Sequence, residues 1–207
     1  METDDEQVEK LKKWWEENGR SVIAGVIIGV GGLFGYRYWI DLQEENAEAA
    51  SVHFVQMMEA LKSSDNAVIA QQADTLISDY SDTDYATLAR FALARNLVDS
   101  GKYDQAQTQL EQVIGTVGDG PLGYLARKRL ASVQLQSVQL EQALVTLGVE
   151  FPSAFSAGVY ELRGDIYAQQ GKIDEAANAY REALSATPGP ANSEFLQQKL
   201  DDLGVTG

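Results

Sequence analysis

Histidine, cysteine and clustered carboxylates are the side chains that most often carry out catalysis or bind metals, and this sequence offers few of them. The chain of 207 residues has no cysteine and a single histidine, His53. It therefore lacks a thiol nucleophile, a disulfide and a set of Cys or His ligands for a transition metal. The acidic run 79–84 (DYSDTD) lacks the glycine and terminal glutamate of a calcium loop, so we predict a solvated turn there and a structural role for His53.

Two other stretches have residues that serve chemistry in other proteins. Gly118–Pro121 is rich in glycine, but no strand precedes it and no Lys-Ser or Lys-Thr follows it, so we predict a turn and not a phosphate site. Asp174 and Glu175 lie at a predicted helix start, where acidic residues are favourable. We therefore predict a protein that is not an enzyme, with no catalytic residue, metal, cofactor or small-molecule substrate. The rival hypothesis is an unrecognised carboxylate site, which a compact polar pocket holding two carboxylates with shifted pKa values would favour.

The clearest element of the sequence is an apolar run near its start. Residues 21–36 carry no charge, and with residues 37–40 they make a stretch of about 20 residues, which as a helix spans roughly the thickness of a bilayer's hydrocarbon core. No later segment approaches this character. We predict a transmembrane helix over residues 21–40 that anchors the remaining domain, residues 41–207, to a membrane.

The charges on either side of this run predict its orientation. Basic residues precede it and acidic residues follow it: Lys10, Lys12, Lys13 and Arg20 before, and Asp41, Glu44, Glu45 and Glu48 after. Because Lys and Arg favour the cytoplasmic side, we predict a cytoplasmic segment over residues 1–20 and the rest of the chain outside. A cleavable signal peptide is the alternative, since residues 47–49 (AEA) have the form that a signal peptidase needs. The run is longer than in such a peptide, however, and acidic residues follow it.

The apolar run contains two Gly-x-x-x-Gly patterns, formed by Gly25, Gly29, Gly31 and Gly35. Such spacing lets a second helix approach closely. We predict that these glycines pack against another transmembrane helix, which belongs either to a second copy of the chain or to another membrane protein. The alternative is that glycine is simply common in membrane helices.

The charge of the remaining chain restricts its partners. After residue 40 there are 11 Lys and Arg against 24 Asp and Glu, a net charge of −13. This charge argues against nucleic acid, which is bound through positive charge, and against adhesion to anionic lipid. It favours solubility and partners that are basic or apolar.

A repeat occupies much of this acidic part. Residues 102–106, 139–143 and 172–176 share a five-residue pattern ending in alanine, at offsets of 37 and 33 residues, a period typical of stacked helical hairpins. Each copy lies between two predicted helices: 86–100 and 105–114, 124–137 and 141–150, 159–170 and 174–186. Gly101 and Gly171 occupy two of the turns, where glycine ends a helix well. Val138 occupies the third, so we predict a different turn there.

The last copy, AGVYELRGDIYAQQGKIDEAANAYREALSATPG, resembles a tetratricopeptide repeat closely. Gly164 and Ala176 are small where the two helices of a repeat touch, and Pro188 ends the second helix. Arg163 departs from the motif, which usually has leucine there. The residues that match the motif are Tyr160, Gly164, Tyr167, Gly171, Ala176, Tyr180, Ala183, Leu184 and Pro188.

We therefore predict an all-α fold, in which one N-terminal transmembrane helix is followed by a tetratricopeptide-like solenoid of helical hairpins. Its parts are a helical pair over residues 43–78, repeats over about 87–118, 124–154 and 157–190, and a capping helix over 193–203. On the first helix of the pair, Val52, Val55, Met58 and Leu61–Lys62 are expected to form an apolar stripe. On the capping helix, Phe195, Leu196, Leu200 and Leu203 are expected to face inward, and Gln197, Gln198, Lys199, Asp201 and Asp202 outward.

In tetratricopeptide folds the first helix of each pair lines the concave side, and this face is the candidate binding site. Arg95 and Lys128 could grip a peptide carboxylate there, with Phe91 and Leu135 making apolar contacts. The alternative is that this face is only solvated. The residues expected to line the site are Leu88, Phe91, Arg95, Leu125, Lys128, Ser132, Leu135, Glu161, Asp165 and Gln169.

Over its full length the chain resembles the YfgM family, ancillary subunits of the bacterial Sec translocon. The resemblance rests on the basic start, the glycine-rich span and the acidic array that ends in GDIYAQQGKIDEAANAYREAL. It implies a single-pass inner-membrane protein beside SecYEG, associated with a PpiD-type membrane-anchored chaperone, that helps pass secreted proteins to periplasmic chaperones. It also implies restraint of the Rcs stress-response regulator from the cytosolic side. Only residues 1–20 are predicted to lie on that side, so this role would rest on them alone. The alternative is a tetratricopeptide scaffold for an envelope or cell-wall assembly complex.

Overall fold

The computed structural model describes residues 4–186 and 190–204, and within these ranges the regular secondary structure is entirely α-helical, which confirms the all-α prediction. Pro188, which was expected to end the last repeat, lies outside the described residues. The helices in chain order are α1 (Asp4–Ser63), α2 (Asn66–Ser78), α3 (Asp84–Asp99), α4 (Tyr103–Val117), α5 (Pro121–Gln136), α6 (Leu140–Thr146), α7 (Ser153–Gln169), α8 (Ile173–Ala186) and α9 (Pro190–Asp202).

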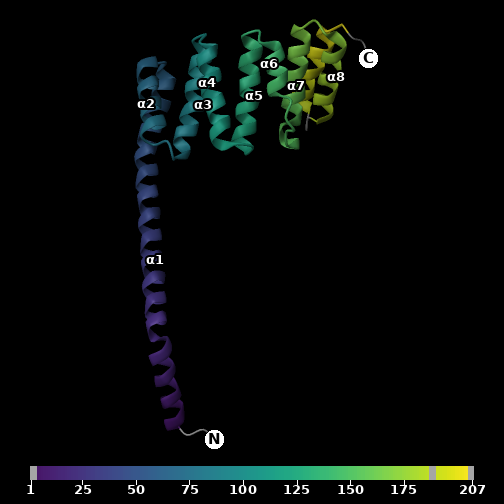
Figure 1. Cartoon of the computed structure of the whole chain (residues 1–207). Helices are drawn as coiled ribbons and strands as arrows, with labels where there is room; N and C mark the ends of the chain where they lie inside the picture. The colour runs from purple at the N-terminus through teal and green to yellow at the C-terminus, as the bar shows by residue number, and fades with distance from the viewer. Residues whose placement is uncertain (1–3, 187–189, 205–207) are drawn as a thin grey trace. The chain divides into compact units, whose positions relative to one another are not determined.

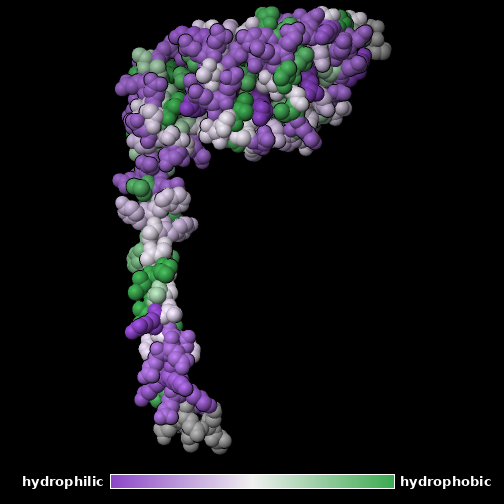
Figure 2. Space-filling model, viewed as in Figure 1, coloured by the Kyte–Doolittle hydropathy of each residue, from purple (hydrophilic) through white to green (hydrophobic). Residues whose placement is uncertain are grey.

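The chain divides within α1 into two compact units, residues 1–50 and residues 51–207, and each is described by itself. In the first unit, α1 is long and apolar enough to cross a membrane, by its length and composition. Its large apolar side chains, such as Ile28 and Phe34, are exposed. Figure 2 shows hydrophobic side chains gathered along the middle of this helix. Apolar surface of this kind is stable in lipid and unfavourable in water, so the unit fits a single-pass membrane anchor.

The second unit is a series of helices that pack in chain order (Figure 1). From α2 to α9 each helix contacts the next, and α5 also contacts α7. Buried side chains form clusters between successive hairpins: Leu110 and Leu130 belong to one that joins α3, α4 and α5, Leu147 and Ile166 to one that joins α5, α6 and α7, and Tyr180 to one that joins α7, α8 and α9. Each hairpin thus buries its apolar face against its neighbours, as in a solenoid.

The three turns at the repeat signature share one geometry. Gly101, Val138 and Gly171 all have positive φ, at 72°, 62° and 74°. In each turn the next residue donates a hydrogen bond back to the preceding helix, as Gln139 does to the carbonyl of Gln134 at 2.8 Å. The prediction of a different turn at Val138 is therefore wrong. The hydrogen bonds that end the helix impose the left-handed conformation even on a β-branched residue.

Replacing Val138 by glycine should stabilise the protein by about 1 kcal/mol. A non-glycine residue at positive φ is strained by roughly 1–3 kcal/mol, and glycine relieves this strain while adding about 0.5–1 kcal/mol of chain entropy to the unfolded state. Little burial is lost, because Val138 is 64% exposed. The free energy of unfolding, from urea denaturation of the full chain in detergent, checks the prediction. The converse change, Gly171→Val, should destabilise the protein. If Val138→Gly and the wild type are equally stable, the backbone at Val138 is not strained.

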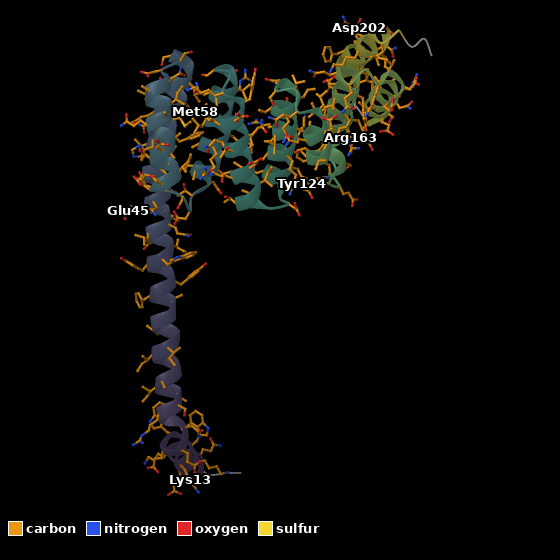
Figure 3. All side chains as sticks on the ribbon, turned by 45° about the horizontal axis from the view of Figure 1, so that its top comes forward. Lys13, Glu45, Met58, Tyr124, Arg163 and Asp202 are labelled. Atoms are coloured by element: carbon orange, nitrogen blue, oxygen red, sulfur yellow. The ribbon has the colours of Figure 1, made fainter. Side chains whose placement is uncertain are left out.

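The last repeat shows why its motif residues are needed. A Cβ added at Gly164 would overlap the ring of Tyr180, so the contact between α7 and α8 requires glycine there. Arg163 (labelled in Figure 3) stands where the motif has leucine. Its Nη2 donates a hydrogen bond to the carbonyl of Leu147 at 2.6 Å. Leu147 follows the short helix α6, whose last carbonyls have no partner within the helix. Arg163 therefore stabilises the end of α6, a role that leucine could not fill.

The first helix of the second unit buries a different face from the one predicted. Val52, Val55 and Met58 are exposed (Met58 is labelled in Figure 3), whereas Met57 and Ala60 are buried. The prediction chose the face of the helix that carries the most large apolar side chains. The packed face is instead formed by Met57 and the small Ala60, since a small side chain lets neighbouring segments approach closely.

His53 has the structural role that the sequence predicted. Its Nδ1 hydrogen-bonds to Oε1 of Gln72 on α2 at 2.7 Å. Its ring centroid lies 5.5 Å from that of Tyr80. The imidazole thus links α1 to the α2 hairpin through one polar and one aromatic contact.

Candidate functional site

A hollow on the second unit lies between α3 and α5, over part of α4. Its volume is about 380 Å³, within the range of about 300–1,000 Å³ typical of binding pockets. We call it the α3–α5 groove. Its lining residues are Phe91, Ala94, Arg95, Val98 and Asp99 of α3, Leu110 of α4, and Arg129, Ser132, Val133 and Gln136 of α5.

The predicted site residues on α3 lie at or near this groove. Arg95 lines it, with an exposed side chain. Phe91 lines it too, but is only 6% exposed, so it forms the floor and is not a free contact residue. Leu88 is exposed and does not line the groove.

The predicted residues on α5 are divided between two sides of the helix. Ser132 lines the groove. Leu125 is half-buried against the core between α3, α4 and α5, and Leu135 packs against the core between α5, α6 and α7. Lys128 lies against α7, because a Cβ added at Gly158 would touch its ammonium group. The sequence therefore did not place Lys128 correctly as a partner of Arg95.

The basic residue that does line the groove from α5 is Arg129, which the sequence analysis missed together with Asp99 and Gln136. Adjacent residues of a helix lie about 100° apart, so an error of one residue in the register of α5 is enough to place Lys128 at the groove in place of Arg129. The Arg-Lys-Arg run at 127–129 marked α5 as the most basic helix of the second unit. It could not tell which of the three residues faces α3.

Two guanidinium groups are held at the groove by different contacts. Nε of Arg95 donates to both carboxylate oxygens of Asp99, at 3.0 and 2.9 Å. The guanidinium carbon of Arg129 lies 4.9 Å from the centroid of the Phe91 ring, a cation–π distance. An exposed ion pair such as Arg95–Asp99 adds only about 0.3–0.5 kcal/mol to stability. Its main effect is to fix the direction in which the terminal nitrogens of Arg95 point.

The predicted site residues on α7 are engaged by the last helix. Nζ of Lys199, on α9, lies 2.8 Å from Oε1 of Glu161 and 2.7 and 2.9 Å from the two oxygens of Asp165. The hydroxyl of Tyr180 donates to Asp165 at 2.7 Å. Gln169 is exposed. The acidic end of the predicted site therefore carries its own cation within the chain.

This arrangement corrects the predicted orientation of α9. Lys199 was expected to face outward but turns inward, and Phe195 was expected to face inward but is 56% exposed. The reason is electrostatic: two carboxylates on α7 that are about a third exposed need a nearby cation, and the long stem of lysine reaches them. Leu196 and Leu200 are buried as expected.

The interactions of this cluster raise the pKa of Lys199. Burial alone would lower the pKa of the Lys199 ammonium, but its hydrogen bonds to Asp165 and Glu161 and the charges of these residues outweigh burial and hold that pKa above the ordinary 10.5. Burial, together with the hydrogen bond to Asp165, also raises the pKa of Tyr180. Because the folded-state pKa of Lys199 exceeds the unfolded value, its stabilisation is complete at neutral pH and is lost only as pH rises through the raised pKa.

The variant Lys199→Met should loosen α9 while keeping the apolar stem. Glu161 and Asp165 would face each other without a cation, so the free energy of opening α9 should fall by about 1.5 kcal/mol. Its amides should then exchange roughly tenfold faster. Hydrogen–deuterium exchange of the full chain in detergent at pH 7 checks this, with the amides of α4 as the internal control. Unchanged exchange in α9 would contradict a stabilising role for the cluster.

The geometry of these carboxylates gives little support to the rival hypothesis of a carboxylate-based enzyme. Glu161 and Asp165 both bind the ammonium of Lys199, and Asp165 also accepts a hydrogen bond from Tyr180, so these carboxylates already have partners within the chain. In the part of the chain that the structure describes, no group of three or more His, Cys, Asp or Glu could hold a metal ion.

The four glycines proposed for helix packing have open surroundings. A Cβ added at Gly25, Gly29, Gly31 or Gly35 would meet no atom within 4 Å. The surface over them is therefore accessible to another helix, as close packing through small residues requires.

Comparisons with known proteins extend over nearly the whole chain. The sequence model of the family described as "Tetratricopeptide repeat-like domain" matches residues 12–205. The "Ancillary SecYEG translocon subunit" of Escherichia coli (strain K12) is 32% identical over 204 residues, which are 99% of this chain and 98% of that protein. The protein of the same name from Haemophilus influenzae (strain ATCC 51907 / DSM 11121 / KW20 / Rd) is 30% identical over 200 residues, 97% of each chain.

Solved structures share a helical architecture with about three quarters of this chain. "MamA 41-end from Desulfovibrio magneticus RS-1" aligns with a TM-score of 0.57 and 17% identity, over 75% of this chain and 89% of that one. "MamA RS-1 ArsTM double mutant" aligns with a TM-score of 0.53 and 17% identity, over 75% and 94% of the two chains. At this level of identity the likeness shows a common fold and nothing about partners.

Proposed function

This chain belongs to the tetratricopeptide repeat-like family of ancillary SecYEG translocon subunits, and from this membership we propose that it is a non-catalytic interaction subunit anchored beside SecYEG in the bacterial inner membrane. The observation that carries the proposal is the identity of 32% over 99% of the chain with such a subunit. The exposed apolar band of α1 supports a membrane anchor, and the solenoid supports a role in binding proteins.

The proposed topology has residues 1–20 in the cytoplasm, one span over residues 21–40 and the solenoid in the periplasm. The basic residues before the span and the acidic residues after it support this direction. In this topology the α3–α5 groove is on the side of the membrane where secreted chains emerge. The glycines of the span dock against a neighbouring transmembrane helix.

The proposed mechanism is geometric. A tether beside the translocon raises the effective concentration of the solenoid for emerging and resident partners to the order of millimolar, without a tight contact. The solenoid then helps pass secreted proteins to periplasmic chaperones, in association with a PpiD-type membrane-anchored chaperone. At the cytosolic side, residues 1–20 restrain the Rcs response regulator.

Photo-crosslinking from α3, about one turn before the groove residue Phe91, tests this proposal. A photoreactive amino acid is placed at the exposed Leu88, since Phe91 is too buried to report on partners, and Val145 on α6 serves as an exposed control. At native abundance, position 88 should give adducts with translocon subunits or periplasmic chaperones, and position 145 should not. Recovery of neither class of partner from position 88 would contradict the proposal.

A further inference from the structure

Arg129 lines the α3–α5 groove without an acidic partner among the residues that the structure describes. Arg127 pairs with Asp119 and Lys199 pairs with Glu161 and Asp165. Arg129, by contrast, is exposed, and among the residues that the structure describes its contact is with the Phe91 ring. Although the chain has 24 acidic residues after position 40, no described carboxylate pairs with this guanidinium, so its positive charge is available to a ligand in the groove.

A second guanidinium lines the same hollow in a fixed direction. Asp99 holds Arg95 through Nε alone, so the two terminal nitrogens of Arg95 remain for another acceptor. The fork of an arginine matches the two oxygens of a carboxylate, and such charge-assisted hydrogen bonds are about twice as strong as neutral ones. Holding the side chain in advance lowers the entropy lost when a ligand binds.

The rest of the groove offers contacts of another kind. Its floor is apolar, with Phe91, Leu110 and Val133 buried beneath the guanidinium groups. Ser132 and Gln136 at its wall can donate hydrogen bonds. A ligand that fits both features carries a carboxylate and, beside it, an apolar side chain that covers the floor.

We propose that the α3–α5 groove binds an extended segment of a partner protein in which an aspartate or glutamate stands next to an apolar residue. The inference deepens the proposed function, on which it rests, by giving the chemistry of the bound segment. It also runs against the net charge of the chain, which by itself would favour a basic partner. The attraction of the two groove arginines outweighs the repulsion by the net charge of the chain. At physiological salt a charge is largely screened beyond about 8 Å, whereas Arg95 and Arg129 would touch the ligand.

Crosslinking of the full chain in native membranes tests the inference. A photoreactive amino acid replaces Gln136, which is exposed and lines the groove, and mass spectrometry identifies the partner peptides joined to it. We expect these peptides to carry Asp or Glu next to an apolar residue. We also expect Arg129→Glu to lower the adduct yield about tenfold, which corresponds to about 1.4 kcal/mol, and Arg129→Lys to lower it less.

The matched control is Arg181→Glu, which makes the same change of charge at an exposed position on α8 that hydrogen-bonds to Asn178. It should leave the adduct yield at the wild-type level. Circular dichroism melting of each variant in detergent verifies that it is folded. If Arg129→Glu melts early, Arg129→Gln, which removes the charge at similar length, should reduce the yield in the same way.

The outcomes separate the two proposals. Equal yields from wild type and Arg129→Glu, or crosslinked peptides rich in Lys and Arg, would overturn the acidic ligand while leaving groove binding in place. Absence of adducts from both position 136 and position 88 would overturn groove binding itself, and the acidic ligand with it.

Discussion

Replacement of Gly123 by alanine should lower the free energy of unfolding by about 3 kcal/mol or more, a large effect for one added methyl group. A Cβ at Gly123 would overlap the carbonyl oxygen of Gly118 and lie 3.0 Å from its carbonyl carbon. These are backbone atoms of the turn between α4 and α5, so they cannot rotate away as a side chain could. Either the turn or the first residues of α5 must move, and α5 carries both Arg129 and the core residue Leu130.

Gly115 provides the matched control for this prediction. It lies inside α4, and a Cβ added there would meet no atom within 4 Å. Gly115→Ala should therefore stabilise the protein by about 0.5–1 kcal/mol, through helix propensity alone. Circular dichroism melting of the full chain in detergent measures both variants. About 3 kcal/mol corresponds to roughly 6–12 °C for a chain of this size, and a Gly123→Ala variant that melts with the wild type would contradict the tight turn.

A double substitution in the apolar run, Ile27→Arg with Leu33→Arg, should abolish stable membrane insertion. Both side chains are exposed on α1, so neither change removes a contact within the protein. An arginine near the centre of a transmembrane helix raises the insertion free energy by about 3 kcal/mol, and two of them exceed what the remaining apolar residues provide.

Fractionation of bacterial membranes measures the effect. After alkaline carbonate extraction the wild type should stay in the membrane pellet, and the double arginine variant should appear in the supernatant. The control exchanges the same residues conservatively, Ile27→Leu with Leu33→Ile, and should behave as the wild type. If the double arginine variant also resists extraction, α1 is not the anchor.

The order and type of the helices of the second unit followed from the sequence because their signals are local. The Gly101 and Gly171 turns and the 3.6-residue period of apolar positions depend on nearby residues alone. Gly164 could be assigned to a helix contact for a similar reason, since the repeat motif fixes its position relative to Tyr180.

The orientation of individual faces did not follow, because it depends on partners distant in the chain. Lys199 turns inward only because Glu161 and Asp165 lie within its reach, 38 and 34 residues earlier. Arg129 faces the groove in place of its neighbour Lys128, a difference of one residue that helix packing decides. At Val138 the hydrogen bonds of the turn overrule the preference of a β-branched residue.

Purification of the anchored full chain from membranes in mild detergent, at native abundance and followed by mass spectrometry, tests the central claim most directly. We predict recovery of SecYEG subunits together with a membrane-anchored periplasmic chaperone, and their loss from a matched preparation of the double arginine variant. Recovery of a cell-wall or envelope assembly complex without SecYEG would contradict the account, as would recovery of SecYEG in equal amounts without the anchor.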